Sequence, residues 1–206
     1  MRTFPAALCV YFALTAAANA ATIRFDEDPF LGSTALTTPG RQVVGGEPFV
    51  SFDPATDVFE FAEPAFAPYG FGPPLVVANG EIGDIPTSGA NVIVLRTFDN
   101  DSDPSTPFNA GTAANLIAAQ VTSPGAGAFI YFNQGLDLPR LVFSTDLSDA
   151  TADLKILARM TNLGGTAGQA AMAGFSSENF AAVPEPATLL LLSVGLAWSA
   201  SRRRLP

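Results

Sequence analysis

Three aspartates stand at alternate positions in one short segment, where they could bind a hard cation. Asp99, Asp101 and Asp103 alternate with polar residues, and calcium prefers several oxygen ligands held in a flexible loop. The segment is not an EF-hand, because Pro104 stands where that loop needs glycine and Ala110 stands where a glutamate should close it. Two interpretations stay open: a calcium loop of another type, or a solvated acidic turn after a strand, which is the commoner case.

Two residue types that much enzyme chemistry needs are missing or misplaced. The chain has no histidine, which excludes Ser-His-Asp and Cys-His systems and every histidine-ligated metal site. Its one cysteine, Cys9, lies in a segment that we expect to be removed. A secreted glycoside hydrolase needs only two carboxylates and stays open, although an acidic chain provides such pairs by chance. We expect no enzyme, and no cofactor other than this calcium.

The first 20 residues have the features of a secretory signal peptide. Arg2 gives a positive start, residues 4–15 are apolar, and small residues precede the expected cleavage point. The residues of the cleavage site are Ala18, Ala20 and Ala21. A lipoprotein would need cysteine at position 21, so we expect no lipid anchor. The protein is therefore expected to pass the inner membrane through the Sec translocation machinery.

The C-terminal residues combine three features in order. The tetrapeptide Val183, Pro184, Glu185 and Pro186 comes first, and its prolines prevent regular helix and sheet hydrogen bonding. The apolar run Ala187–Ser201 would enter a bilayer as a helix of roughly 22 Å, shorter than the ~30 Å hydrocarbon core. A basic tail of Arg202, Arg203 and Arg204 follows and is expected to stay cytoplasmic.

This order resembles the PEP-CTERM sorting signal of Gram-negative bacteria that make exopolysaccharide or biofilm. The resemblance implies that Pro184, Glu185 and Pro186 are recognised by exosortase, a transpeptidase-like membrane enzyme that processes the tail. It also implies a transient single-pass anchor with a cytoplasmic C-terminus, followed by release to the cell surface or extracellular matrix. The run Phe129–Leu163 looks like a body found in other proteins with this tail, which implies a common fold and no activity.

The region between the two ends is strongly acidic. Residues 21–182 carry six basic and eighteen acidic side chains, a formal charge of −12. Such a surface repels phosphate backbones, so we expect no nucleic-acid partner. It suits a soluble exported protein, or one that collects cations.

From Ala21 onward, short β-branched and aromatic runs are separated by turns rich in Gly, Pro and Asn, which predicts an all-β fold. Nine strands are expected: Thr22–Phe25, Phe49–Phe52, Val58–Phe61, Leu75–Ala78, Val92–Phe98, Leu116–Val121, Phe129–Phe132, Leu141–Ser144 and Leu154–Met160. Residues 113–121 are also compatible with a short helix, but we favour a strand at the end of that segment. Alternation in the last strand predicts that Lys155 and Arg159 share one face and that Ile156 and Ala158 share the other.

These patterns predict a single β-sandwich domain, of jelly-roll or immunoglobulin-like type, over residues 21–163, after a signal peptide at 1–20. Residues 164–182 are rich in Gly, Ala, Ser and Asn and are expected to be a flexible linker. Residues 183–206 are expected to hold the sorting signal with one hydrophobic helix.

Three functions remain. The first is a non-catalytic structural or adhesive protein of the surface or matrix, linked to exopolysaccharide or biofilm. The second is a calcium- or carbohydrate-binding module that uses loops between strands. The third, a secreted hydrolase, predicts a cleft with two facing carboxylates.

Overall fold

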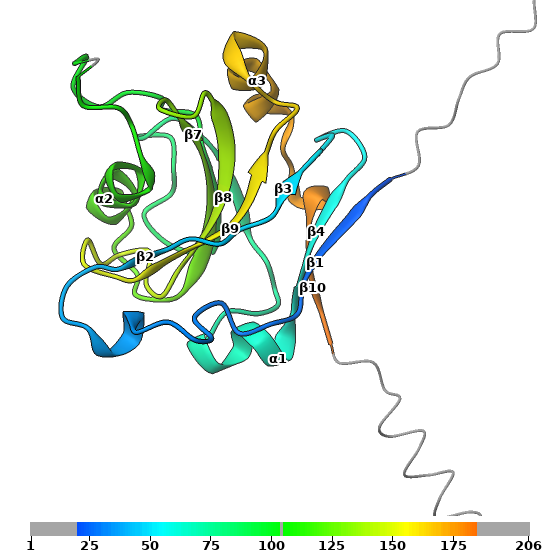
Figure 1. The fold of residues 1–206 in the computed structure, drawn as a ribbon, viewed down its shortest axis with the longest axis vertical. Helices are drawn as coiled ribbons and strands as arrows, with labels where there is room; N and C mark the ends of the chain where they lie inside the picture. The colour runs from blue at the N-terminus through cyan, green and yellow to red at the C-terminus, as the bar shows by residue number, and fades with distance from the viewer. Residues whose placement is uncertain (1–19, 104, 185–206) are drawn as a thin grey trace, which may run out of the picture.

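A computed structural model describes residues 20–103 and 105–184 of the chain. These residues form three layers: helix α2 (Ala110–Gln120), a large mixed sheet, and a small parallel sheet (Figure 1). The expected all-β sandwich, jelly-roll or immunoglobulin-like, is wrong. A helix covers one face of the large sheet, and most strand pairs are parallel, which the short loops of a sandwich do not produce.

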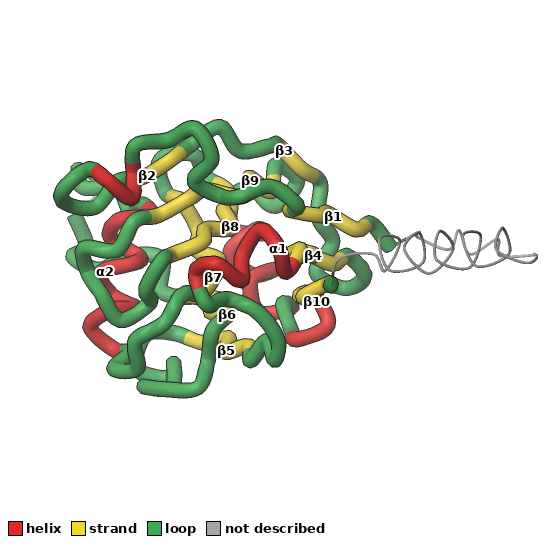
Figure 2. Tube along the Cα trace, turned by 90° about the horizontal axis from the view of Figure 1, so that it is seen from below, coloured by secondary structure: helices red, strands yellow, loops and turns green. Residues whose placement is uncertain are grey.

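The large sheet forms the middle layer, and its long strands lie side by side in Figure 2. Its order is β2 (Val43–Val44), β9 (Leu154–Met160), β8 (Leu138–Ser144), β7 (Gly127–Asn133), β6 (Val92–Leu95) and β5 (Val77–Gly80), and β3 (Phe49–Val50) also pairs with β9. Strands β7, β8 and β9 form an antiparallel meander, whereas the other pairs are parallel.

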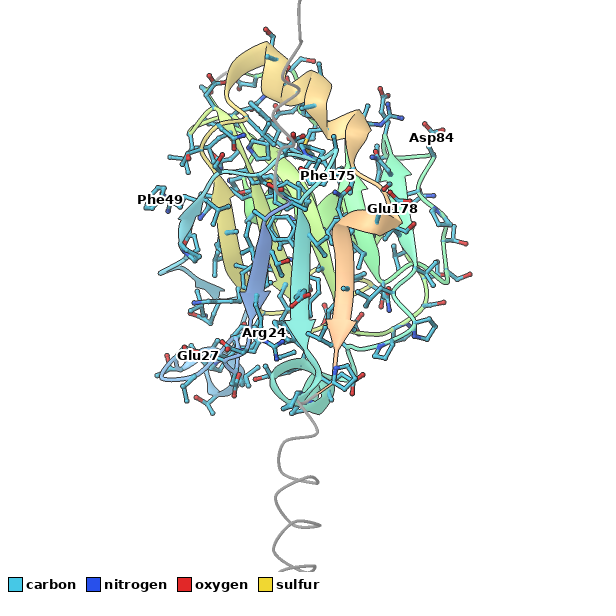
Figure 3. The ribbon with its side chains drawn as sticks, turned by 90° about the vertical axis from the view of Figure 1, so that its right-hand side faces the viewer. Arg24, Glu27, Phe49, Asp84, Phe175 and Glu178 are labelled. Carbon is cyan, nitrogen blue, oxygen red and sulfur yellow. The ribbon has the colours of Figure 1, made fainter. Side chains whose placement is uncertain are left out.

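The small sheet joins the first and last strands of the described chain. Strands β1 (Thr22–Phe25) and β10 (Phe180–Val183) flank β4 (Val58–Ala62), and both run parallel to it (Figure 3). Because all three strands point the same way, the chain enters this sheet at one end and leaves it at the other.

Apolar side chains on the two faces of the large sheet build two cores. Val92 and Val94 face the small sheet together with the rings of Phe59 and Phe61, while Ile93 on the opposite face packs with α2. Strand β6 is therefore buried on both faces, as its unbroken apolar run predicts. Phenylalanine rings fill much of the space between the sheets, for example Phe52 stacked on Phe59 with centroids 4.1 Å apart.

The strand expected at Leu116–Val121 is wrong, because these residues belong to the last turns of α2 and the residue after it. Asn109 caps the helix: its side-chain oxygen accepts hydrogen bonds from the backbone N–H groups of Gly111 and Thr112. Buried apolar residues recur at helical spacing, at Ala110, Ala113, Ala114 and Ile117. Helical spacing and an N-cap were both present in the sequence, and they outweigh the strand propensity of the final residues.

The flexible linker expected at residues 164–182 is also wrong. That segment contains helix α3 (Gly165–Ala171), two 3-10 turns at Met172–Gly174 and Ser177–Asn179, and strand β10. Met172 and Phe175 are buried, and the Asn79 side chain donates hydrogen bonds to both of their carbonyl oxygens. Buried anchors spaced among small residues therefore order the segment. The remaining short elements are α1 (Glu63–Phe66) and 3-10 turns at Ala35–Thr37 and Ala67–Tyr69.

A β-bulge in β9 changes which side chains share a face. Leu141 of β8 pairs with Ala158, and Val142 pairs with Ile156, so Leu157 has no partner. Ile156 consequently joins the core under α2, whereas Ala158 joins the core between the sheets. The expected alternation through all of β9 is wrong for this reason.

Candidate functional site

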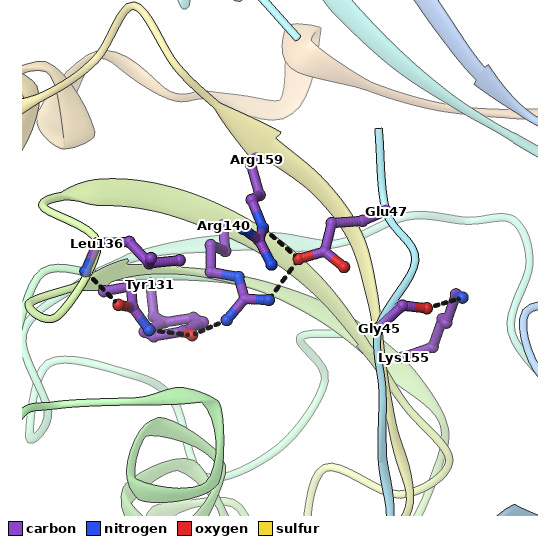
Figure 4. A network of polar contacts seen from close by, with 8 residues as sticks. Gly45, Glu47, Tyr131, Leu136, Arg140, Lys155 and Arg159 are labelled. Atoms are coloured by element: carbon purple, nitrogen blue, oxygen red, sulfur yellow. Dashed lines mark hydrogen bonds and ion pairs between the residues drawn. The ribbon is translucent and has the colours of Figure 1, made fainter. Parts of the chain in front are cut away.

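The bulge brings two arginines together on one face of the large sheet. Arg140 of β8 and Arg159 of β9 are register partners on neighbouring strands, an arrangement that like charges make unfavourable. Glu47, in the connection between β2 and β3, lies over both guanidinium groups and forms ion pairs with each (Figure 4). Its side chain is only 1% exposed. The carboxylate thus neutralises the pair and ties the connection to the sheet.

Glu47 is held in its charged form. Burial raises the pKa of this carboxyl, but a backbone N–H and the side chains of Arg159 and Arg140 offset the burial and leave the pKa below its usual value. An acid catalyst must carry a proton at working pH, so Glu47 is unsuited to that role. The two arginines are likewise occupied by Glu47.

The network continues into the interior through Tyr131 of β7. The buried hydroxyl of Tyr131 accepts hydrogen bonds from Asn133 Nδ2 at 2.9 Å and from Arg140 Nη1 at 3.4 Å. Asn133 Oδ1 in turn accepts the backbone N–H of Leu136 in the β7–β8 turn (Figure 4). Burial raises the pKa of Tyr131, although Arg140 lowers it in part. The cluster therefore links strands β7, β8 and β9 with the β2–β3 connection and the β7–β8 turn.

A cavity of about 260 Å³ lies beside Glu47, between the segment after β1, the β2–β3 connection and β9. Acidic side chains from Asp26 and Glu27, basic side chains from Arg24 and Lys155, and apolar Leu31 contribute to its wall. Lys155 Nζ donates a hydrogen bond to the Gly45 carbonyl oxygen at 2.7 Å. The volume lies just below the roughly 300 Å³ at which small-molecule sites begin.

The aspartates of the candidate calcium loop hydrogen-bond to their own turn. Asp99 Oδ1 accepts the backbone N–H groups of Asp101 and Ser102, and Asp101 Oδ1 accepts that of Asp103. These contacts keep the pKa of Asp99 below its usual value. No set of three or more acidic, histidine or cysteine side chains in the described ranges is arranged to hold a metal ion. Calcium binding by Asp99, Asp101 and Asp103 stays a prediction, which a calcium-dependent rise in melting temperature would support.

The described residues of the two expected processing sites lie next to the two ends of the small sheet. Ala21 directly precedes β1, and Val183 is the last residue of β10, with Pro184 following it. Ala18, Glu185, Pro186, the apolar run Ala187–Ser201 and the arginines at 202–204 lie outside the described residues. None of the helices between residues 20 and 184 combines the length and apolarity needed to cross a membrane.

The sequence analysis missed the Glu47 cluster. Glu47 is 93 residues from Arg140 and 112 residues from Arg159 in the chain, so no local spacing in the sequence reveals the cluster. The available signal was weaker: Arg140 and Arg159 each stand between apolar neighbours within a strand, and a charge in such a position requires a partner.

Comparisons with known proteins concern the end of the chain. No curated protein and no solved structure matches the chain. A protein-family model described as the PEP-CTERM protein-sorting motif matches residues 182–204. The match begins inside β10, where Ala182 and Val183 pair with Phe61 and Ala62 of β4. The chain thus carries a PEP-CTERM protein-sorting motif at its C-terminus, which implies an exported protein that exosortase sorts.

Proposed function

We propose that the body, residues 21–183, is a non-catalytic structural or adhesive unit that the sorting tail delivers to the cell surface or extracellular matrix. The observation that carries the proposal is the overlap of the sorting motif with β10, a strand of the folded body. A tail that begins within a sheet presents the whole body as its cargo, without an intervening flexible segment.

The state of the carboxylates supports a body without catalysis. Glu47, the acidic group at the cavity that is most buried, is ion-paired with two arginines. Asp57 and Asp149 accept hydrogen bonds from neighbouring backbone N–H groups. Each of these groups is occupied in holding the fold, whereas a glycoside hydrolase requires one carboxyl that holds a proton and a second that faces it.

The proposed route begins with the Sec machinery and with removal of the signal peptide (the leader, residues 1–20) by cleavage before Ala21. The tail then anchors the protein in the membrane until exosortase processes it, and the mature protein lacks Arg202–Arg204. Intact-mass measurement of exported material from an exosortase-positive host and from a deletion strain tests this step. Detection of the complete tail on exported protein from both strains would contradict it.

The role of the body is tested by exchanging it. One strain produces the native protein, a second produces the leader and tail fused to an inert domain, and a third carries Pro184→Ala, Glu185→Ala and Pro186→Ala. A structural or adhesive body predicts that matrix cohesion and cell attachment fall in the second and third strains. Unchanged cohesion in the second strain, with the fusion present on the surface, would show that the body contributes nothing.

The cavity beside Glu47 favours one second function, the binding of a saccharide. Charged groups at its wall, such as Glu27 and Arg24 (Figure 3), suit sugar hydroxyls, and the exposed Leu31 offers apolar surface for the C–H face of a ring. Calorimetric titration with exopolysaccharide fragments tests it. Glu27→Gln is expected to weaken binding, whereas Glu178→Gln, an exposed acid outside the cavity, is the matched control. Equal affinity for all three proteins would remove the cavity from consideration.

A further inference from the structure

The nitrogen atom at the expected leader cleavage point contacts a buried carboxylate. Ala21 N lies 2.8 Å from Asp57 Oδ1, and Asp57 is 6% exposed. The contact follows from sheet register: Thr22 pairs with Val58, so the preceding residues, Ala21 and Asp57, also face each other. The Ala21 carbonyl oxygen accepts the Val58 N–H at 2.9 Å. Both polar groups of Ala21 are therefore fixed at the start of the small sheet.

Asp57 lacks a cationic partner among the described side chains, since the ion pairs formed there involve Glu47 and Glu60. Its carboxylate is held by hydrogen bonds alone, from Ala21 N, Asp53 N at 2.8 Å and Thr56 Oγ1 at 3.0 Å. Burial raises the pKa of this carboxyl, but the three donors outweigh burial and lower the pKa below its usual value. A buried negative charge thus stands at the new N-terminus.

Cleavage before Ala21 would convert this amide nitrogen into an ammonium group at the same position. We propose that Asp57 is the binding site for the α-ammonium group of Ala21, so that leader removal installs an ion pair at the first step of the β1–β4 pairing. The proposal rests on the expected cleavage point and not on the role of the body. A hydrogen bond between two charged groups is roughly twice as strong as a neutral one.

The other polar groups around this ammonium have partners of their own, so Asp57 is the carboxylate that can pair with it. From the turn before β4, the exposed Asp53 carboxylate accepts the Ala55 N–H. From the 3-10 turn before β10, the Asn179 amide donates to the Asp57 backbone oxygen at 2.8 Å. The pair Arg24–Glu60 lies further along β1 and β4. The ammonium stabilises the fold below its ordinary pKa of about 7.7–8.0 and loses this effect as pH rises through its raised value.

The chemistry of the chain allows a direct test. Lys155 is the only lysine, so a chain that begins at Ala21 has two amines, the α-amine and the Lys155 side chain. The experiment compares this chain with one that begins at Ala20, in which position 21 is again an amide. Both are treated with limiting acylating reagent, and peptide mass spectrometry gives the rate at the α-amine relative to Lys155. At neutral pH the α-amine of Ala21 is expected to react about tenfold more slowly than that of Ala20, because one unit of pKa removes nine-tenths of the neutral form.

The pH profile separates an ion pair from simple shielding. Ion pairing moves the midpoint of the Ala21 acylation profile upward by about one pH unit, whereas shielding lowers the rate at every pH and leaves the midpoint in place. The chain that begins at Ala21 is expected to melt at a higher temperature than the chain that begins at Ala20, because only the former can form the ion pair. Asp57→Asn is expected to return the midpoint to that of the Ala20 chain and to abolish this difference in melting temperature. If that variant does not fold, the Ala20 and Ala21 chains still decide the question. Equal midpoints in those two chains would overturn the proposal.

Discussion

Glu47 supplies the negative charge that two neighbouring arginines, Arg140 and Arg159, require. Arg140 and Arg159 are opposite each other on β8 and β9. The bulge at Leu157 places the Arg159 side chain on the same face of the sheet as that of Arg140. Phe49, on the other side of β9, places its ring 5.1 Å from the Arg159 guanidinium, a cation–π contact that adds to the ion pair. The charged groups therefore compensate one another within a mostly apolar sheet, and the contribution of each depends on the others.

Removal of the Glu47 charge is expected to destabilise the fold. Glu47→Gln leaves Arg140 and Arg159 opposed without an anion, and loss of one partner from a buried pair costs about 2–3 kcal/mol where the arginines keep some exposure. Urea unfolding monitored by circular dichroism measures the change. Glu81→Gln replaces an exposed acid and is the control, for which we expect a change below about 0.5 kcal/mol.

The same carboxylate predicts a pH dependence. Because the folded-state pKa of Glu47 is lowered, its stabilising effect is complete above the unfolded value of about 4.3 and is lost as pH falls through the folded value. The gap in unfolding free energy between wild type and Glu47→Gln should therefore be constant from neutral pH down to about pH 5 and shrink below about pH 4. A gap that persists unchanged at the lowest pH would assign the effect to packing and not to charge.

At the scale of elements, the segment from α3 to β10 shows how small residues can pack into a layer. Gly168 lies where α3 meets the backbone of Leu163: an added Cβ would come within 1.8 Å of the Leu163 carbonyl oxygen. Phe175 stacks on Phe52 with ring centroids 5.4 Å apart. Glycine and alanine here allow close approach, and large anchors at intervals supply the buried area.

Gly168→Ala is expected to destabilise the protein by about 2 kcal/mol or more, because the new methyl group must displace backbone atoms. Gly174→Ala is the matched control, since its added Cβ would meet Pro54 at an ordinary 3.5 Å. Thermal unfolding of both variants measures the effect. If Gly168→Ala unfolds like the wild type, α3 does not pack as described.

The sequence predicted the strands better than their arrangement. Strand β9 has the predicted bounds, Leu154–Met160, and β6 begins at Val92 as predicted but ends at Leu95 and not at Phe98. Such segments can be found because the burial of a strand is visible in its composition. The parallel pairing of β1 and β10 with β4 was not predictable, since it joins segments that are distant in the chain. The Glu47 site was not predictable for the same reason. In addition, the one-residue bulge in β9 moves the side chains that follow it to the opposite face of the sheet. The sorting motif, by contrast, is local, and its prediction is confirmed.

At the scale of the whole molecule, the small sheet is complete only when its last strand, β10, has paired with β4. Strand β4 is paired on one side by β1 and on the other by β10, and Asn179, just before β10, donates hydrogen bonds to the backbone oxygens of Pro54 and Asp57. The core rings of Phe52 and Phe59 lie near this junction and contact Phe175 and Phe180. The fold is therefore complete only once the chain has been exported as far as Val183.

Two truncations test this dependence. A chain ending at Val183 keeps β10 and is expected to unfold cooperatively, whereas a chain ending at Ser176 loses β10 and the Asn179 contacts and is expected to be degraded rapidly. Limited proteolysis, with band intensities followed over time, compares the two. Equal resistance would show that β10 is dispensable, and the body would then end before it.

The parallel flanking strands have a mechanical consequence. Tension between Ala21 and Val183 would pull β1 and β10 in opposite directions along β4, so that the hydrogen bonds of each pair bear the load together and cannot open one at a time. A body held at one end by a surface and at the other by matrix would resist such loading as a shear clamp. Single-molecule pulling through the two chain ends is expected to give a higher rupture force than pulling through an attachment at Ala62 and the C-terminal end, which peels β10 from its neighbour.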